Sequence, residues 1–271
     1  MNRQSEKNVN DVWEVGGAYE SFIGRWSRPV AAEFLGWLAI PAGRTWLDVG
    51  CGTGVLTQSI LNLASPANVR GIDQAPGFIS FAKNQVRDPR AVFAVGSADA
   101  LSVTSDTYDV VVSGLLLNFL PDSDLAISEL KRVTKPGGVV AAYVWDYADK
   151  MEVLRNFWDA AAMFDSRAAR LDEGTRFPIC HPEKLRNLFI DQGLSGVEVR
   201  PIDAPAHFPD FQDYWSPFLL GQGPGPSYVA SLDEDQRSDL RERVRARLPI
   251  SAEGTIDLIA RAWAVRGKKG R

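Results

Sequence analysis

The segment from residue 45 to residue 54, TWLDVGCGTG, restricts the fold more than any other part of the chain. A short apolar run ends in Gly50, Gly52 and Gly54, and a helical pattern begins at Val55. Glycines at a strand-to-helix turn let a ligand approach the backbone, and the N-terminus of the helix favours a carboxylate or phosphate. The spacing is G-x-G-x-G. It differs from the G-x-G-x-x-G of a nicotinamide site because Val55 stands where that site has a glycine.

An acid ends the next predicted strand, Val69–Asp73. Asp73 lies about 20 residues after the glycines, where a carboxylate can accept hydrogen bonds from two ribose hydroxyls. The two features together predict a nucleoside-containing ligand at the edge of a sheet.

Strand and helix patterns alternate through the first half of the chain. Besides Val69–Asp73, the predicted strands are Thr45–Val49, Ala91–Val95, Tyr108–Ser113 and Val139–Trp145. The predicted helices between them are Val55–Leu63, Pro76–Gln85 and Leu125–Thr134, the last ended by Pro136-Gly137-Gly138. Strands separated by helices predict a parallel sheet with right-handed crossovers.

Five ordered segments resemble the class I S-adenosylmethionine-dependent methyltransferases: LDVGCGTG, GIDQAP, GSADAL, YDVVVSGLLLNFLPD and LKRVTKPGGVVAAYVW. Within that superfamily the chain is most similar to the ubiquinone/menaquinone-biosynthesis-like group of small-molecule enzymes, from about Tyr19 to Trp145. The resemblance implies a Rossmann-like α/β fold with helices on both faces of a seven-stranded, mostly parallel sheet. Its strand order would be 3-2-1-4-5-7-6, with strand 7 antiparallel. The late strands predicted at 197–202 and 256–265 fit positions 6 and 7.

The implied activity is transfer of a methyl group from S-adenosylmethionine to a small organic acceptor by in-line displacement, with S-adenosylhomocysteine as product. The acceptor atom and the oligomeric state stay open. The alternatives are an RNA-modifying methyltransferase and a non-catalytic S-adenosylmethionine-binding or scaffolding protein.

The resemblance also implies cofactor contacts. The backbone of Gly50, Cys51 and Gly52 would line the methionine part, and Asp48 would orient its amino group. Asp73 would hold the ribose. The other expected cofactor contacts are Gln74, Ala98 and Asp99 around the adenine, the backbone carbonyl of Leu115 near the methionine amine, and Tyr19 or Arg28 from the N-terminal helix.

No catalytic base is assigned from the sequence. Many relatives carry histidine or another polar residue at the position of Asn118, so a histidine-based role is not expected here. Asn118, Trp145 and Trp215 are the expected substrate-pocket residues. We also expect 204–225, with five aromatic residues between Phe208 and Phe218, to form part of a lid, the alternative being that these rings are only structural.

The composition of the chain excludes several classes of binding partner and several kinds of site. Lys plus Arg is 30 and Asp plus Glu is 34, a net charge of −4, which argues against a general polyanion binder. Two cysteines and two histidines predict neither a disulfide framework nor a metal site. No apolar run is long enough for a membrane helix, and the polar start lacks the apolar core of a signal peptide. We therefore expect a cytoplasmic protein that binds neither nucleic acid nor membrane.

The expected organisation is one methyltransferase domain over 12–266. Cap elements are expected at 12–40, which includes a helix from Tyr19 to Leu38, and at 204–254, which includes a charged helix near Leu232–Leu248. Residues 1–11 and the tail 267–271 are expected to be flexible.

Overall fold

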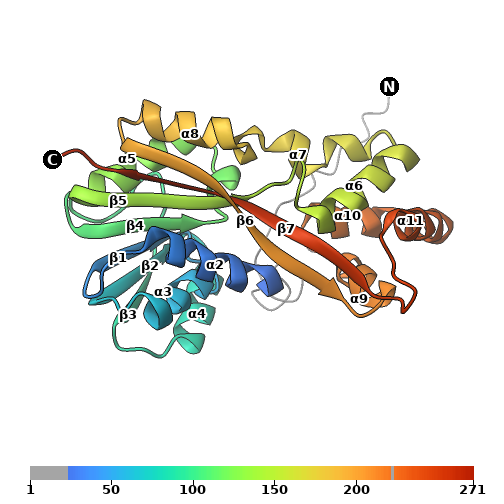
Figure 1. The fold of residues 1–271 in the computed structure, drawn as a ribbon, viewed down its shortest axis with the longest axis horizontal. Helices are drawn as coiled ribbons and strands as arrows, with labels where there is room; N and C mark the ends of the chain where they lie inside the picture. The colour runs from blue at the N-terminus through green and yellow to red at the C-terminus, as the bar shows by residue number, and fades with distance from the viewer. Residues whose placement is uncertain (1–23, 221–222) are drawn as a thin grey trace, which may run out of the picture.

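The computed structural model describes residues 24–220 and 223–271. Its central element is a seven-stranded sheet in the order β3-β2-β1-β4-β5-β7-β6 (Figure 1). Strand β7 is antiparallel to both β5 and β6, and the other neighbours are parallel, which confirms the predicted topology. The strands are β1 (Thr45–Val49), β2 (Asn68–Asp73), β3 (Ala91–Val95), β4 (Tyr108–Gly114), β5 (Thr134–Trp145), β6 (Ser195–Phe208) and β7 (Ile256–Lys268).

Helices cover both faces of this sheet. Figure 1 shows α2 (Arg25–Leu38), α3 (Val55–Leu63) and α4 (Pro76–Gln85) on one side. On the other side lie α5 (Ser123–Val133) and α8 (Pro182–Asp191). Strand β4 is buried on both faces from Val110 to Ser113, as its unbroken β-branched run predicts. The predicted helix from Tyr19 is described only from Arg25 onward, and Tyr19 itself lies outside the described residues.

The Pro-Gly-Gly segment does not form the helix stop that its sequence suggests. Helix α5 already ends at Val133, and β5 begins at Thr134 and includes Pro136-Gly137-Gly138. The pairing of β4 with β5 shifts register between Tyr108 and Val110. A Cβ atom on Gly138 would lie 2.7 Å from the backbone oxygen of Asp109, so glycine is needed there for close approach of the two strands.

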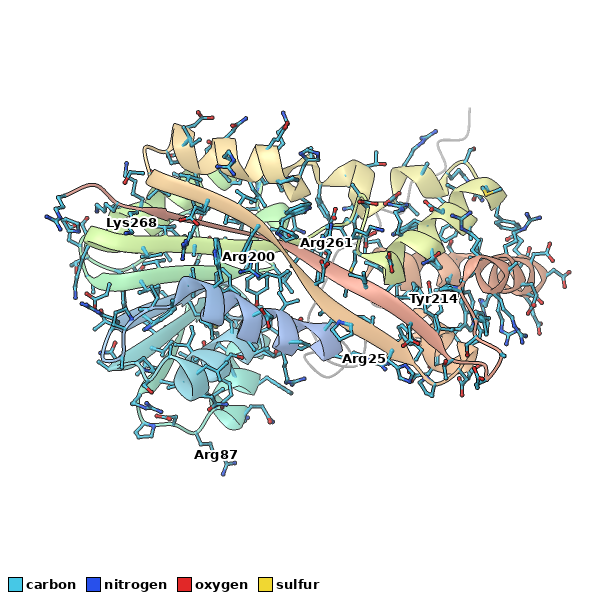
Figure 2. The ribbon with its side chains drawn as sticks, in the orientation of Figure 1. Arg25, Arg87, Arg200, Tyr214, Arg261 and Lys268 are labelled. Carbon is cyan, nitrogen blue, oxygen red and sulfur yellow. The ribbon has the colours of Figure 1, made fainter. Side chains whose placement is uncertain are left out.

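Strands β6 and β7 are longer than the sequence indicates and form a twisted ribbon that runs past the other strands (Figure 1). The first five residues of the expected lid, 204–208, belong to β6. The expected flexible tail is also wrong at its start, because Gly267 and Lys268 pair in β7 (Figure 2 labels Lys268). The ammonium of Lys269 then donates to Asp106 at 2.7 Å and to the carbonyl of Thr134 at 2.9 Å.

The far end of this ribbon carries a helical cap. Its helices are α6 (Glu152–Phe164), α7 (Glu173–Arg176), α9 (Phe211–Trp215), α10 (Pro224–Ser231) and α11 (Glu234–Arg247). Helix α6 ends at Phe164, and a separate 3-10 turn follows at Ala168–Arg170. The rings of Phe157 and Phe218 stack at 4.3 Å. The hydroxyl of Tyr214, which Figure 2 labels, donates to the carbonyl of Val153 at 2.7 Å. The aromatic stretch therefore joins α9 to α6 as the core of the cap.

Candidate functional site

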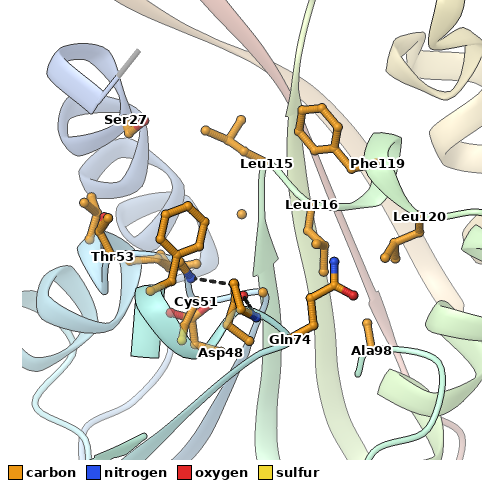
Figure 3. Close-up of a pocket in the computed structure, with 18 of the residues that line it drawn as sticks. Ser27, Asp48, Cys51, Thr53, Gln74, Ala98, Leu115, Leu116, Phe119 and Leu120 are labelled. Atoms are coloured by element: carbon orange, nitrogen blue, oxygen red, sulfur yellow. Dashed lines mark hydrogen bonds between the residues drawn. The ribbon is translucent and has the colours of Figure 1, made fainter. Parts of the chain in front are cut away.

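A cavity of about 350 Å³ opens at the carboxyl ends of β1, β2 and β4 (Figure 3). This volume lies within the range of small-ligand pockets, about 300–1,000 Å³. Open α/β sheets bind ligands at this edge, where the chain reverses direction between neighbouring crossovers. The described residues that line it include Ser27, Asp48, Gly50, Cys51, Gly52, Asp73, Gln74, Phe78, Ala98, Leu115, Leu116, Asn118, Phe119, Leu120, Tyr143 and Phe177.

The glycine turn forms one wall of the cavity. Gly50, Gly52 and Gly54 have φ angles of 73°, 51° and 89°, a region that favours glycine. A Cβ atom at Gly52 would meet no described atom within 4 Å, so the missing side chain leaves open space beside the turn.

The amides of this turn are hydrogen-bonded within the protein. The N–H groups of Gly50 and Cys51 both donate to the carbonyl of Ile72, at 2.7 and 3.0 Å. The amide of Gly52 donates to the Asp73 carboxylate at 2.9 Å. The sequence suggested that these amides face a ligand. In the structure they fasten β1 to β2, and the turn contributes space to the cavity.

Asp73 lies at the end of β2, where the sequence places an acid for a ribose. Its Oδ2 accepts from the amide of Gly52 and its Oδ1 accepts from the amide of Ala75 at 2.9 Å. Burial raises the pKa of Asp73, and the two amide hydrogen bonds oppose that shift. A carboxylate oxygen has two acceptor sites, so each oxygen keeps capacity for one ligand hydroxyl.

Asp48 is fully buried at the end of β1. Its Oδ2 accepts from the hydroxyl of Thr57 at 2.7 Å, whereas its Oδ1 has no hydrogen-bond partner among the described residues. Burial raises the pKa of Asp48 to about 7, and the neighbouring Asp73 carboxylate adds to the increase. A buried carboxylate oxygen without a partner calls for a donor, and a ligand ammonium in the cavity would provide one.

The opposite end of the cavity is apolar and follows β4. Leu115 has a φ of 59°, rare for a leucine, and its amide donates to the carbonyl of Tyr143 at 2.8 Å. This turn starts the 3-10 helix Leu117–Phe119. The Phe119 ring meets the Phe177 ring edge to face at 5.4 Å.

The structure gathers most of the expected site residues and separates others. Gln74, Ala98 and Leu115 line the cavity as expected. Asp99 is not among the lining residues described, and its carboxylate accepts from the Ser97 hydroxyl. Arg28 lines a neighbouring depression with Gln58 and Asn62.

Of the residues expected to line the acceptor pocket, one lines the cavity and two do not. Asn118 lines the cavity, whereas Trp145 and Trp215 are absent from the lining that the described residues form. Trp215 is 2% exposed and stacks with Phe211 and Phe218. The expectation that Trp215 lines the pocket is therefore wrong, because its ring packs the cap, and the lid stays a prediction.

Sequence reasoning missed Phe78, Tyr143 and Phe177 as lining residues. Tyr143 is on β5, and alternation along that strand could have placed it on one face. Phe177 lies beyond the last matched motif segment, which ends at Trp145, and nothing local in the sequence marks it as a lining residue.

Cys51 does not have the surroundings of a nucleophile. Its thiol is buried, and burial together with the carboxylates of Asp48 and Asp73 raises its pKa. Within residues 24–220 and 223–271, no group of three His, Cys, Asp or Glu side chains is arranged to hold a metal ion.

Comparisons with known proteins agree with this geometry. A family model described as "Methyltransferase domain" matches residues 47–142. The chain is 33% identical over 181 residues to a 2-methyl-6-phytyl-1,4-hydroquinone methyltransferase of Synechocystis, an alignment that covers 59% of this chain and 57% of that enzyme. It is 33% identical over 176 residues to a demethylmenaquinone methyltransferase of Bacillus licheniformis, covering 60% of this chain and 75% of that enzyme.

The fold is also found among solved structures. Phosphoethanolamine N-methyltransferase 2 of Haemonchus contortus, solved with S-adenosyl-L-methionine, superimposes with a TM-score of 0.60 at 16% identity. That match covers 98% of this chain and 59% of the nematode chain. The present chain thus spans little more than half the length of the Synechocystis relative and of this structural neighbour.

Proposed function

The chain belongs to the class I S-adenosylmethionine-dependent methyltransferases, and from this premise we propose that it transfers a methyl group to a small organic acceptor bound at the apolar end of the cavity. The observation that carries the proposal is the pairing of two ends in one cavity. Asp48, Asp73 and the glycine turn form a polar end, and Leu115, Phe119 and Phe177 form an apolar end.

The polar end has the donors and acceptors that the cofactor requires. Asp73 would hold the ribose hydroxyls with its remaining lone pairs, and the unpartnered Oδ1 of Asp48 would accept from the methionine ammonium. The open space beside Gly52 would admit the methionine part, with Gln74 and Ala98 beside the adenine. Asp99 and Arg28 lie outside the described lining and have no part in this proposal.

When bound, S-adenosylmethionine supplies a methyl group that its positively charged sulfur already activates. The protein therefore has to hold the acceptor in line and exclude water, and its apolar residues do both. Leu115, Leu116 and Leu120 form the dry wall on the β4 side. A base is needed only for an acceptor that arrives protonated.

The partners we propose follow from charge and packing. The arginines of α11 face other groups of the protein: Arg247 pairs with Asp159 at 2.9 Å, and the guanidinium of Arg241 lies 4.9 Å from the centre of the Phe211 ring. These two arginines therefore engage groups of the protein itself, which supports a small-molecule acceptor rather than RNA. We also propose a cytoplasmic location. No helix in the described part of the chain is long and apolar enough to cross a membrane.

The test is calorimetric titration of S-adenosylhomocysteine into wild type and Asp73→Asn. Asparagine keeps an oxygen for the Gly52 or Ala75 amide, so the turn can fold, but it loses the charge that strengthens the ribose hydrogen bonds. Each such bond contributes about 1.5–3 kcal/mol, so affinity should fall at least about tenfold. Asp88→Asn, on the surface beside Arg90, is the matched control and should bind as wild type does. Unchanged affinity in Asp73→Asn would reject the ribose assignment.

Catalysis needs a second measurement. Wild-type protein incubated with methyl-labelled S-adenosylmethionine and a panel of small acceptors should release labelled product and S-adenosylhomocysteine. Tight cofactor binding without transfer to any acceptor would support the non-catalytic alternative.

A further inference from the structure

A second cavity, of about 460 Å³, lies at the edge of the sheet opposite to the cavity beside the glycine turn. It is bordered by the segment that precedes β1 and by the first residues of β4 and β5, so it lies at the amino ends of these strands. Lys268, which lines it, is labelled in Figure 2 at the end of the molecule away from the helical cap. We call it the amino-edge cavity.

Glycines keep the amino-edge cavity open. Gly137 and Gly196 line it with φ angles of 78° and 58°, and a Cβ atom on either would meet no described atom within 4 Å. The pairing of β6 with β7 shifts register between Ser195 and Glu198, so Gly196 lies in an irregularity of the ladder. Since glycine adopts these φ angles without strain, the backbone itself maintains the open space.

The amino-edge cavity carries an excess of positive charge. Its ionisable lining residues are four cations and two acids: Arg44, Lys135, Arg266, Lys268, Asp109 and Glu198. Four positive and two negative charges leave a net charge of +2. The cavity beside the glycine turn has the opposite sign, because the charged side chains among its described lining residues are Asp48 and Asp73. The two cavities therefore favour ligands of opposite charge.

Both acids of the amino-edge cavity already have cationic partners in the protein. The ammonium of Lys135 donates to Asp109 at 3.0 Å, and the guanidinium of Arg266 donates to Glu198 at 3.0 Å. Arg266 also donates to the carbonyl of Trp37 at 2.9 Å and lies over the Trp37 ring at 4.6 Å. These two pairs neutralise each other and leave the remaining two cations uncompensated.

Those two cations are Arg44 and Lys268. Neither side chain makes a hydrogen bond or an ion pair within residues 24–220 and 223–271, and both are exposed, so a ligand can reach them. In the strand pairing Val110 lies opposite Val139, and Val139 lies opposite Lys268. Directly paired side chains point to the same face of a sheet, so Lys268 lies on the face that lines the cavity.

We propose that the amino-edge cavity binds a small phosphate monoester. A phosphate monoester carries a charge of about −1.5 to −2 at pH 7, which matches the uncompensated charge of the cavity. The planar guanidinium of Arg44 can bind two phosphate oxygens, and the ammonium of Lys268 adds a point charge. Ile40, Pro41 and Val139 line the same cavity and offer apolar surface to the carbon part of the ester. The proposal is independent of methyl transfer.

The test is calorimetric titration of butyl phosphate into the full chain at low ionic strength. Arg44→Gln and Lys268→Gln should each weaken binding about tenfold, because each variant removes a charge-assisted hydrogen bond. Both side chains are exposed, so neither change should affect folding. Lys83→Gln, which removes an exposed cation of α4 outside the lining of either cavity, is the matched control and should bind as wild type does.

Two other probes define the ligand class. Pentanoate has a carbon chain similar to that of butyl phosphate but a single charge, so wild type should bind it about tenfold more weakly. Inorganic phosphate lacks the carbon part and should also bind more weakly than butyl phosphate. Equal binding of inorganic phosphate would assign the cavity to free phosphate and reject the ester.

A matched pair of substitutions at Gly137 tests where the ligand binds. Asparagine and aspartate tolerate the left-handed φ of 78°, and position 137 has room for a Cβ atom. The two side chains have nearly the same size and differ in charge. Gly137→Asn should bind butyl phosphate within about threefold of wild type, whereas Gly137→Asp should bind it at least about tenfold more weakly, because its carboxylate would lie in the cavity.

Three results would overturn the proposal. Wild type that does not bind butyl phosphate would reject the site. Unchanged affinity in both Arg44→Gln and Lys268→Gln would place the phosphate elsewhere, and equal affinities of Gly137→Asn and Gly137→Asp would show that the charge of this cavity does not select the ligand. Failure of the proposed function is recognised separately, because it is measured with S-adenosylhomocysteine.

Discussion

Replacement of Glu173 by glutamine should stabilise the protein at neutral and alkaline pH. Glu173 begins α7 and is 5% exposed, and its carboxylate accepts from the indole N–H of Trp158. Burial raises its pKa from 4.5 to about 7, and the nearby Asp172 carboxylate adds to the increase, although the hydrogen bonds oppose it. The folded protein therefore holds the proton on this side chain at pH values where the unfolded chain has released it.

The magnitude follows from the two pKa values. A group whose pKa is higher in the folded state than in the unfolded state stabilises the folded protein. This contribution is complete at pH values below the unfolded-state pKa and is lost as the pH rises through the folded-state pKa. For Glu173, the pH range over which this stability is lost therefore runs from 4.5 to about 7. Each pH unit within it corresponds to about 1.4 kcal/mol, so the wild type should lose about 3 kcal/mol through this group. Glutamine keeps an acceptor for Trp158 and has no proton to release.

The assay is urea unfolding of wild type and Glu173→Gln at several pH values from about 5 to 8. At each pH, the free energy of unfolding of the wild type is subtracted from that of the variant. This difference should rise in favour of the variant by about 2.5 kcal/mol over the range. Glu183→Gln, on the exposed side of α8, is the control and should show a constant difference. A difference for Glu173→Gln that does not change with pH would refute the reasoning.

Three further predictions concern the cavity and the cap. Gly52→Val should abolish S-adenosylhomocysteine binding with near-normal circular dichroism, because the valine side chain would fill the open space beside position 52, where φ is 51°. Retained binding would show that the turn does not border the ligand. Trp215→Ala should lower the free energy of unfolding by about 3–5 kcal/mol in thermal unfolding, because the buried ring packs the cap, and should leave cofactor affinity unchanged in the folded protein. Loss of turnover at normal stability would instead favour a lid formed by 204–225. Wild type should bind S-adenosylhomocysteine about tenfold more weakly at about pH 6 than at pH 8, because Asp48, with a pKa of about 7, must be ionised to attract the ligand ammonium. In calorimetric titrations, Asp48→Asn should abolish this pH dependence of the affinity. A pH dependence that persists in the variant would exclude Asp48 as its source.

The residues at the polar end of the cavity were predictable because they are close in sequence to the strand ends that carry them. Asp48, Gly52 and Asp73 each stand at the end of a short strand or just after it, and parallel strands bring such ends to one edge of the sheet. Asp99 shows the limit of this reasoning. A displacement of one residue in a loop turns a side chain away from the cavity, and no periodic pattern fixes a loop.

The sequence by itself determined the alternation of strands and helices and the place of the glycine turn, since apolar periodicity and the residues that break it act over a few neighbouring positions. The strand order followed from the resemblance to the methyltransferases and not from periodicity. Only the tertiary structure decided that β6 and β7 continue as a ribbon to the cap, that the aromatic rings around Trp215 pack against α6, and that Phe177 reaches the cavity. Those outcomes depend on which apolar surfaces meet across long separations in the chain. A tryptophan or phenylalanine carries the same local signal whether it packs a core or lines a cavity, so its role is settled by the surface it contacts.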